Sequence, residues 1–364
     1  MLIRNYLLNL FFCVCFFLTA CGGGDSNDTS KLNEPENDGE MPPPVQIVRP
    51  SGEPAPTASA PPSNSGSQLE PVNSADLNNA ASGAKAVFDL LNAERTRCGF
   101  SALKRHATLD SAARNHALWI LLNWTSSHTE SPNTPGFTGL DMGDRVDQVG
   151  GYYWGSLAEI LHTNFNSFVS LDWKEFGKKG MRSLMSAPFH MTGAFSPDPD
   201  VGISIALSAD DATADVRQTK KGYALVLEIA DVARYVGTPD NENQQFLTYP
   251  CEGTTGTVTR LSNETPNPVP GRNLSTNPVG QPIMIVAGKK EKLTVTTATM
   301  TDANNNNIVA LPLLTNGRND QVAEDTAFLI PDKPLSSNTS YKVTLRGTSG
   351  QTPFDRTFTF STGN

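Results

Sequence analysis

The sequence lacks the short motifs that usually mark a catalytic site. It contains no G-x-S-x-G turn, no H-E-x-x-H helix, no P-loop, no G-x-G-x-x-G turn and no C-x-x-C pair. Positive charge is also scarce, because 28 lysines and arginines stand against 37 aspartates and glutamates, which gives a net charge of −9. An acidic chain is a poor partner for nucleic acid or anionic lipid, so no nucleic-acid partner is expected.

Cysteine is rare, and three of the five cysteines lie within the first 21 residues. There, Arg4 precedes an apolar run from Tyr6 to Leu18, which is shorter than the roughly 20 apolar residues of a membrane-spanning helix. This pattern is typical of a secretory signal. The ending Leu-Thr-Ala-Cys21, followed by three glycines, resembles a bacterial lipobox. We therefore expect residues 1–20 to be a signal peptide and Cys21 to carry acyl chains such as palmitate.

The two remaining cysteines are Cys98 and Cys251. Two cysteines in an exported protein suggest a single disulfide, because the compartments outside the cytoplasm are oxidising. Cys98 ends a predicted helix, and Cys251 follows the last predicted strand of the same domain. The bridge would pin the exit of that domain to its first helix.

Composition separates a tether from a first folded domain. Residues 21–78 are rich in Gly, Ser, Asn and Pro and poor in aromatic side chains, so they predict a disordered linker after the lipidated cysteine. Residues 79–250 form one domain of ordinary size, with helical periodicity first and strand patterns at 201–205 and 223–229. Helices followed by an antiparallel sheet predict an α+β fold.

The amino-acid composition changes again after Cys251. Residues 251–269 predict a second linker, and residues 270–364 are rich in Thr, Val, Asn, Pro and Gly, with short strand patterns separated by turns. This alternation predicts an all-β sandwich. The closing strands resemble those of bacterial Ig-like modules.

Five motifs of the first domain, in order, resemble the CAP superfamily of cysteine-rich secretory proteins, venom antigens, plant pathogenesis-related proteins and bacterial SCP-like relatives. They are Leu91-Asn-Ala-Glu-Arg95 with Gly99, Leu109 to Ala117, Ser127-His128-Thr129, Gly143-Asp-Arg-Val146 with Ala158-Glu159-Ile-Leu161, and Ser186-Ala-Pro-Phe-His190. The resemblance implies an α/β/α sandwich. It also implies a cavity with two histidines and two acidic residues, which binds a divalent metal in some members.

Three residues of that cavity carry over: His128, Glu159 and His190. Ala187 stands where the second acid is expected, and Ile160 replaces the family's asparagine. Two imidazoles and one carboxylate are sufficient to hold zinc with an open water position. The alternative is a hydrogen-bonded polar cluster without metal, and this is the interpretation that we favour.

Two further residues are candidates for the edge of the cleft. His116 lies on an apolar helical stripe, where a core role is the simpler interpretation. Asp144 follows a turn, where capping a helix is an equally good explanation.

These observations together predict a lipid-anchored protein of the cell envelope, at the outer membrane facing the periplasm or at the cell surface. Its CAP-like domain is expected to bind or scaffold a lipid, glycan or protein ligand without catalysis and without a required cofactor. The alternatives are a metal-dependent hydrolase, with a metal such as zinc held by His128, Glu159 and His190, and a purely structural envelope protein. The sequence leaves the ligand and the oligomeric state open.

Overall fold

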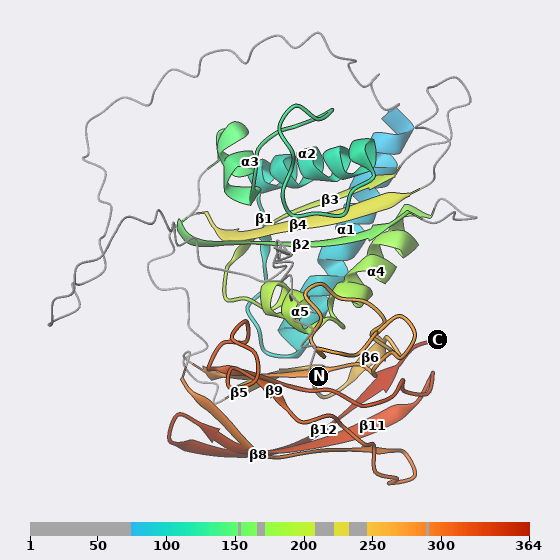
Figure 1. Cartoon of the computed structure of the whole chain (residues 1–364), viewed down its shortest axis with the longest axis vertical. Helices are drawn as coiled ribbons and strands as arrows, with labels where there is room; N and C mark the ends of the chain where they lie inside the picture. The colour runs from blue at the N-terminus through green and yellow to red at the C-terminus, as the bar shows by residue number, and fades with distance from the viewer. Residues whose placement is uncertain (1–73, 152–153, 166–171, 208–221, 233–245, 289–290) are drawn as a thin grey trace, which may run out of the picture. The chain divides into compact units, whose positions relative to one another are not determined.

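The computed structural model describes residues 74–151, 154–165, 172–207, 222–232, 246–288 and 291–364 (Figure 1). The predicted signal segment, Cys21 and all but the last residues of the predicted tether lie outside the described residues. Within those ranges, no helix is both long enough and apolar enough to cross a membrane.

A four-stranded sheet organises the first domain, in the order β1-β3-β4-β2. The strands are β1 (Lys104–Arg105), β2 (Trp154–Asn164), β3 (Asp200–Leu207) and β4 (Tyr223–Asp231). The predicted strand pair at 201–205 and 223–229 corresponds to β3 and β4, which are antiparallel neighbours with Ile203 opposite Leu227. Strand β2 adds to the other edge of β4, also antiparallel, and places Glu159 opposite Glu228.

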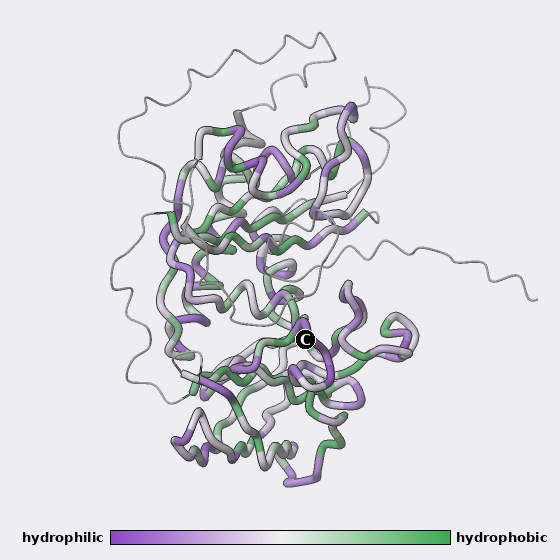
Figure 2. Tube along the Cα trace, turned by 60° about the vertical axis from the view of Figure 1, so that its left-hand side comes forward, coloured by the Kyte–Doolittle hydropathy of each residue, from purple (hydrophilic) through white to green (hydrophobic). Residues whose placement is uncertain are grey.

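Helices cover both faces of this sheet (Figure 1). On one face lie α1 (Ser74–Arg97), α4 (Trp173–Leu184) and α5 (Pro188–Ala194), and on the other lie α2 (Ala107–Asn123) and α3 (Met142–Gln148). Apolar side chains alternate along the strands to serve both layers, so that Ile160 packs with the first group and Leu161 with α2. In Figure 2 hydrophobic stretches run along these strands. The predicted α/β/α sandwich is therefore confirmed.

The C-terminal part consists of two four-stranded sheets, β5-β7-β10-β9 and β6-β12-β11-β8. The bounds of their strands are β5 (Phe246–Tyr249), β6 (Thr254–Thr257), β7 (Ile283–Ala287), β8 (Leu293–Asp302), β9 (Leu314–Thr315), β10 (Thr326–Leu329), β11 (Ser340–Ser349) and β12 (Thr352–Thr362). Side chains from both sheets, among them Ile285, Val343 and Phe358, share one apolar core. This is the all-β region that the strand patterns predict.

Three predicted boundaries differ from the structure. Helix α1 begins at Ser74, inside the predicted tether. Strand β5 was assigned to the first domain, but it pairs with β7, and β6 lies in the predicted linker 251–269 yet pairs with β12. All four residues of β5 are buried, so this strand lacks the polar alternation that would have marked it as part of a sandwich.

The first domain and the β region share a core. Leu247, Met284 and Phe328 of the β region belong to the same buried cluster as Phe189 and Met191 of α5. The disulfide between Cys98 and Cys251, with Cα atoms 5.4 Å apart, lies in this cluster and confirms the predicted bridge. The two parts are therefore joined by packing as well as by covalent bonds.

Candidate functional site

Six ionisable side chains gather on the α2 side of the sheet, and we call them the Glu159 cluster. Its members are His116, His128, Glu130, Arg145, Glu159 and Glu228. Glu159 lies at the centre: its Oε1 is 2.7 Å from Nδ1 of His128, and its Oε2 accepts a hydrogen bond of 2.5 Å from Nη2 of Arg145. The cluster draws on two helices, two strands and the loop after α2.

Helix α3 places Arg145 inside the domain. The helix begins at Asp141, whose side chain accepts a hydrogen bond from the backbone N–H of Asp144. This cap starts the helix so that Arg145 points inward, where its side chain is fully buried. Its Nη1 donates to the backbone carbonyl of His128 at 3.1 Å, so one guanidinium holds both the loop and the carboxylate of Glu159.

Buried His116 has acceptors at both ring nitrogens. Its Nδ1 is 2.9 Å from Oε1 of Glu130, and its Nε2 is 2.8 Å from the backbone carbonyl of Ser127. The Glu130 carboxylate also accepts a hydrogen bond from the backbone N–H of Thr138. His116 therefore links two points of the loop after α2, at Ser127 and at Glu130, to helix α2.

The two carboxyl groups that face each other across β2 and β4 have pKa values shifted in opposite directions. Burial alone raises the pKa of Glu159, but the charges of His116 and Arg145 outweigh it and hold that pKa below its usual range. Burial, and then the negative charge of Glu159, raise the pKa of Glu228 well above 4.5. The site therefore favours the ionised form of Glu159 and the neutral form of Glu228.

His128 is the solvent-facing member of the cluster. Its side chain is 24% exposed, whereas that of Glu159 is 1% exposed and that of His116 is fully buried. Its Nδ1 contact with the ionised Glu159 carboxylate fixes the orientation of the ring.

His190, the third residue of the predicted cleft, lies on the opposite face of the sheet. It belongs to α5, which packs against Ile160, the neighbour of Glu159 that points to the other side. Its Nδ1 is 3.1 Å from Oε1 of Glu264, which also accepts hydrogen bonds from the backbone N–H groups of Phe189 and His190. The expected convergence of His128, Glu159 and His190 is therefore wrong, because a strand directs successive side chains to opposite faces.

A second histidine marks that opposite face. Burial first, and then the charges of His190 and Lys179, lower the pKa of His162 to about 4. Its Nδ1 is 3.0 Å from the Tyr223 hydroxyl. His162 on β2 and His190 on α5 thus form a separate polar region from the Glu159 cluster.

The described residues include no group of three or more His, Cys, Asp or Glu side chains arranged to hold a metal ion. For the proposed ligands this follows from the geometry, since the sheet separates His190 from His128 and Glu159. The arrangement of three zinc ligands, the less favoured interpretation, is not formed, and of the favoured polar cluster only the contact between His128 and Glu159 is present.

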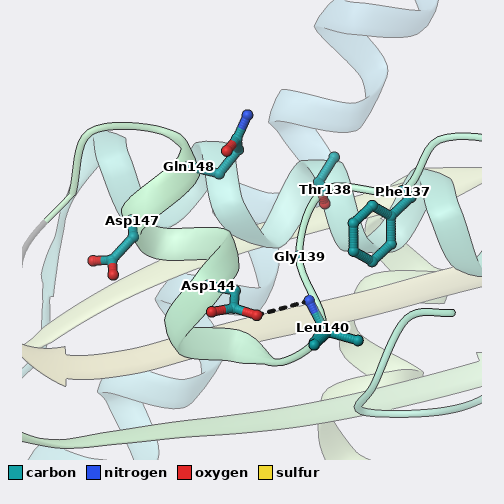
Figure 3. A pocket seen from close by; sticks show the side chains of 7 residues that line it. All are labelled: Phe137, Thr138, Gly139, Leu140, Asp144, Asp147 and Gln148. Atoms are coloured by element: carbon teal, nitrogen blue, oxygen red, sulfur yellow. Dashed lines mark hydrogen bonds between the residues drawn. The ribbon is translucent and has the colours of Figure 1, made fainter. Parts of the chain in front are cut away.

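An open pocket of about 480 Å³ lies beside α3. One wall is the loop Phe137, Thr138, Gly139 and Leu140, and the other is formed by Asp144, Asp147 and Gln148 of α3 (Figure 3). Asp144, a predicted residue of the cleft edge, lines this pocket, and one of its oxygens accepts a hydrogen bond from Leu140 N–H at 3.0 Å. His116, the other such candidate, is instead a buried member of the Glu159 cluster.

Sequence reasoning missed Glu130, Arg145 and Glu228 as parts of the site. Glu228 left a clear signal, because it is the one charged residue inside the apolar strand pattern of residues 223–229. A lone carboxyl group in such a strand needs a partner or a proton. Arg145 lies in the motif Gly143-Asp-Arg-Val146. Its inward orientation, however, depends on the cap at Asp141.

Comparison with known proteins places this geometry in a family. Residues 88–192 match the model of the cysteine-rich secretory protein family, CAP. The crystal structure of an extracellular protein containing an SCP domain, from Bacillus anthracis str. Ames, is similar over 44% of this chain and 44% of that chain, with 15% identity and a TM-score of 0.31. No curated protein matches the chain. The family match therefore identifies a CAP domain at residues 88–192.

Proposed function

We propose that this protein is a lipid-anchored component of the cell envelope whose CAP domain binds a ligand without catalysing a reaction. The observation that carries the proposal is the pairing within the Glu159 cluster. Inside the domain Glu130 pairs with His116 and Glu159 pairs with Arg145, and these four side chains are at most 1% exposed. Because His116 and Arg145 also contact the backbone carbonyls of Ser127 and His128, these pairs hold the loop after α2 in place.

The loop held in this way borders the open pocket. Glu130 accepts hydrogen bonds from the backbone N–H and the hydroxyl of Thr138, which lies in the pocket wall. The buried polar cluster thus lies behind an open pocket of the size of a ligand site, which supports the binding role. The anchor rests on the resemblance of Leu-Thr-Ala-Cys21 to a lipobox, and the tether would hold the domain away from the membrane.

The anchor predicts a modified N-terminus. Protein isolated from membranes should begin at Cys21 and carry acyl chains, because each buried CH₂ contributes about 0.8 kcal/mol and several chains give stable attachment. Mass spectrometry of the N-terminal peptide measures this directly. The Cys21→Ala variant should lose the acyl mass and leave the membrane fraction. An unmodified terminus, or cleavage at another residue, would contradict the anchor.

A hydrolase is the second candidate, and one observation favours it. His128 is partly exposed, and Glu159 orients it through Nδ1 as the carboxylate orients the histidine of a catalytic triad. In this alternative His128 is the general base. The described residues offer no three-residue metal site to assist it.

We expect no hydrolysis that depends on His128. The full chain and the His128→Ala variant should hydrolyse p-nitrophenyl acetate and casein at the same background rate, with added zinc or with EDTA. His106→Ala is the control, since His106 precedes α2 and makes no side-chain capping bond. Turnover that disappears in His128→Ala and persists in His106→Ala would replace the binding proposal with the hydrolase.

A further inference from the structure

The pocket beside α3 has walls of two different kinds, and these specify a ligand. We propose that it binds an aliphatic ammonium group, that is, a cation on an apolar stem such as the side chain of lysine. The inference rests on the proposed binding function and adds the chemical class of the ligand.

The loop wall is apolar and exposed. Phe137 is 39% exposed and Leu140 is 51% exposed, and among the described residues only Val309 is another exposed large apolar side chain. Both side chains line the pocket, so a ligand bound there would contact them. An aliphatic chain would bury both, and the ring of Phe137 also offers its face to a cation.

The helix wall is negatively charged. Asp144 and Asp147 line it, and no lysine or arginine lines the pocket. Asp144 is partly engaged, because it accepts from Leu140 N–H. Asp147 has no side-chain hydrogen bond or ion pair within the described residues and lies in the last turn of α3, where the helix dipole adds further negative potential. This wall therefore complements a cation.

The two walls are held at a fixed separation. The bond from Leu140 N–H to Asp144 joins the loop to α3 (Figure 3). On the far side of the loop, Thr138 donates to the buried Glu130. The pocket of about 480 Å³ is therefore preformed and has the size of a small-ligand site.

The test uses three probes of equal chain length: hexylammonium, hexanol and hexanoate. Each is titrated into the full chain, and backbone amide shifts are followed by NMR. We expect hexylammonium to shift the amides of residues 137–140 and 144–148, to bind more tightly than hexanol, and to weaken as salt is added. Hexanoate should bind most weakly.

Asp147→Asn should weaken hexylammonium binding about two- to five-fold, the effect of one exposed charge pair, and leave hexanol binding unchanged. The matched control is Asp320→Asn, an exposed aspartate that does not line the pocket, which removes the same charge and should leave both affinities unchanged. Leu140→Ser should weaken both probes.

The outcomes separate this inference from the proposed function. If hexanol or hexanoate binds in the pocket as tightly as hexylammonium, the cation preference is wrong while the binding function stands. Equal effects of Asp147→Asn and Asp320→Asn would also overturn the preference. If no probe shifts these amides, the pocket is not the ligand site, whereas His128-dependent hydrolysis alone would overturn the binding function.

Discussion

The protein with Cys98 and Cys251 both replaced by alanine should lose about 4–5 kcal/mol of its free energy of unfolding. The disulfide closes a loop with a sequence separation of 153 residues. Chain-entropy models assign a bridge of this span about 4–5 kcal/mol, because the unfolded chain loses much of its freedom when such a long loop is closed. Denaturant unfolding followed by circular dichroism measures the difference.

Reduced wild-type protein is the control for this loss. Once the bridge is broken by a reductant, the wild type should unfold at nearly the same denaturant concentration as the double variant. A difference of more than about 2 kcal/mol between the two would mean that packing of the alanine side chains causes the loss. A double variant as stable as the oxidised wild type would contradict the prediction.

The same measurement examines the shared core. Cys98 and Cys251 both lie in the buried cluster that combines α5 with β5, β7 and β10. Because the first domain and the β region bury apolar side chains against each other there, they should unfold in one transition even without the bridge. Two separated transitions in the double variant would show that the disulfide is what couples them.

Several features were predictable because they depend on local pattern. The strands β3 and β4 follow from the apolar runs that include Ile203 and Leu227, and the contact between His128 and Glu159 follows from the family motifs. The disulfide follows from counting the cysteines of an exported chain. The strands and the disulfide need only neighbouring residues or a count, whereas the contact between His128 and Glu159, 31 residues apart, depends on the family resemblance.

The features that were missed depend on contacts between distant segments. The family motifs give the order of Glu159 and His190 but not the face of the sheet on which each lies, and β2 sends Glu159 and Ile160 to opposite sides. No nearby residue revealed that Glu264 would reach α5. That carboxylate accepts backbone hydrogen bonds at the start of a helix whose own capping position, Ala187, has no side-chain acceptor.

Arg145→Met should be strongly destabilising, by about 3–5 kcal/mol at neutral pH. Arg145 is fully buried and is hydrogen-bonded to Glu159, so its loss removes one of the cationic partners of a carboxylate inside the domain. The free energy of unfolding, measured with urea at several pH values, tests this.

Two variants serve as controls. Arg346→Met breaks an ion pair with Asp355 in which the arginine side chain is 56% exposed and the aspartate side chain 62% exposed. The loss in free energy of unfolding should therefore be less than about 1 kcal/mol. Glu228→Gln should be similarly mild, because burial raises the pKa of Glu228 and favours its neutral form, which a glutamine imitates.

The pH dependence of the Arg145→Met effect identifies its cause. In the wild type the pKa of Glu159 is depressed, so its ion pairs stabilise the fold above the ordinary glutamate value of about 4.3, and this contribution is lost as the pH falls through the lower folded pKa. Without Arg145, burial should raise the pKa of Glu159, so the variant can protonate it in mild acid. The difference in free energy of unfolding between variant and wild type should therefore be largest near pH 7 and become smaller towards pH 4. A gap that is constant with pH would show that lost packing, and not a stranded charge, causes the destabilisation. A loss no larger than that of Arg346→Met would mean that the Glu159 cluster does not hold the loop behind the pocket in place.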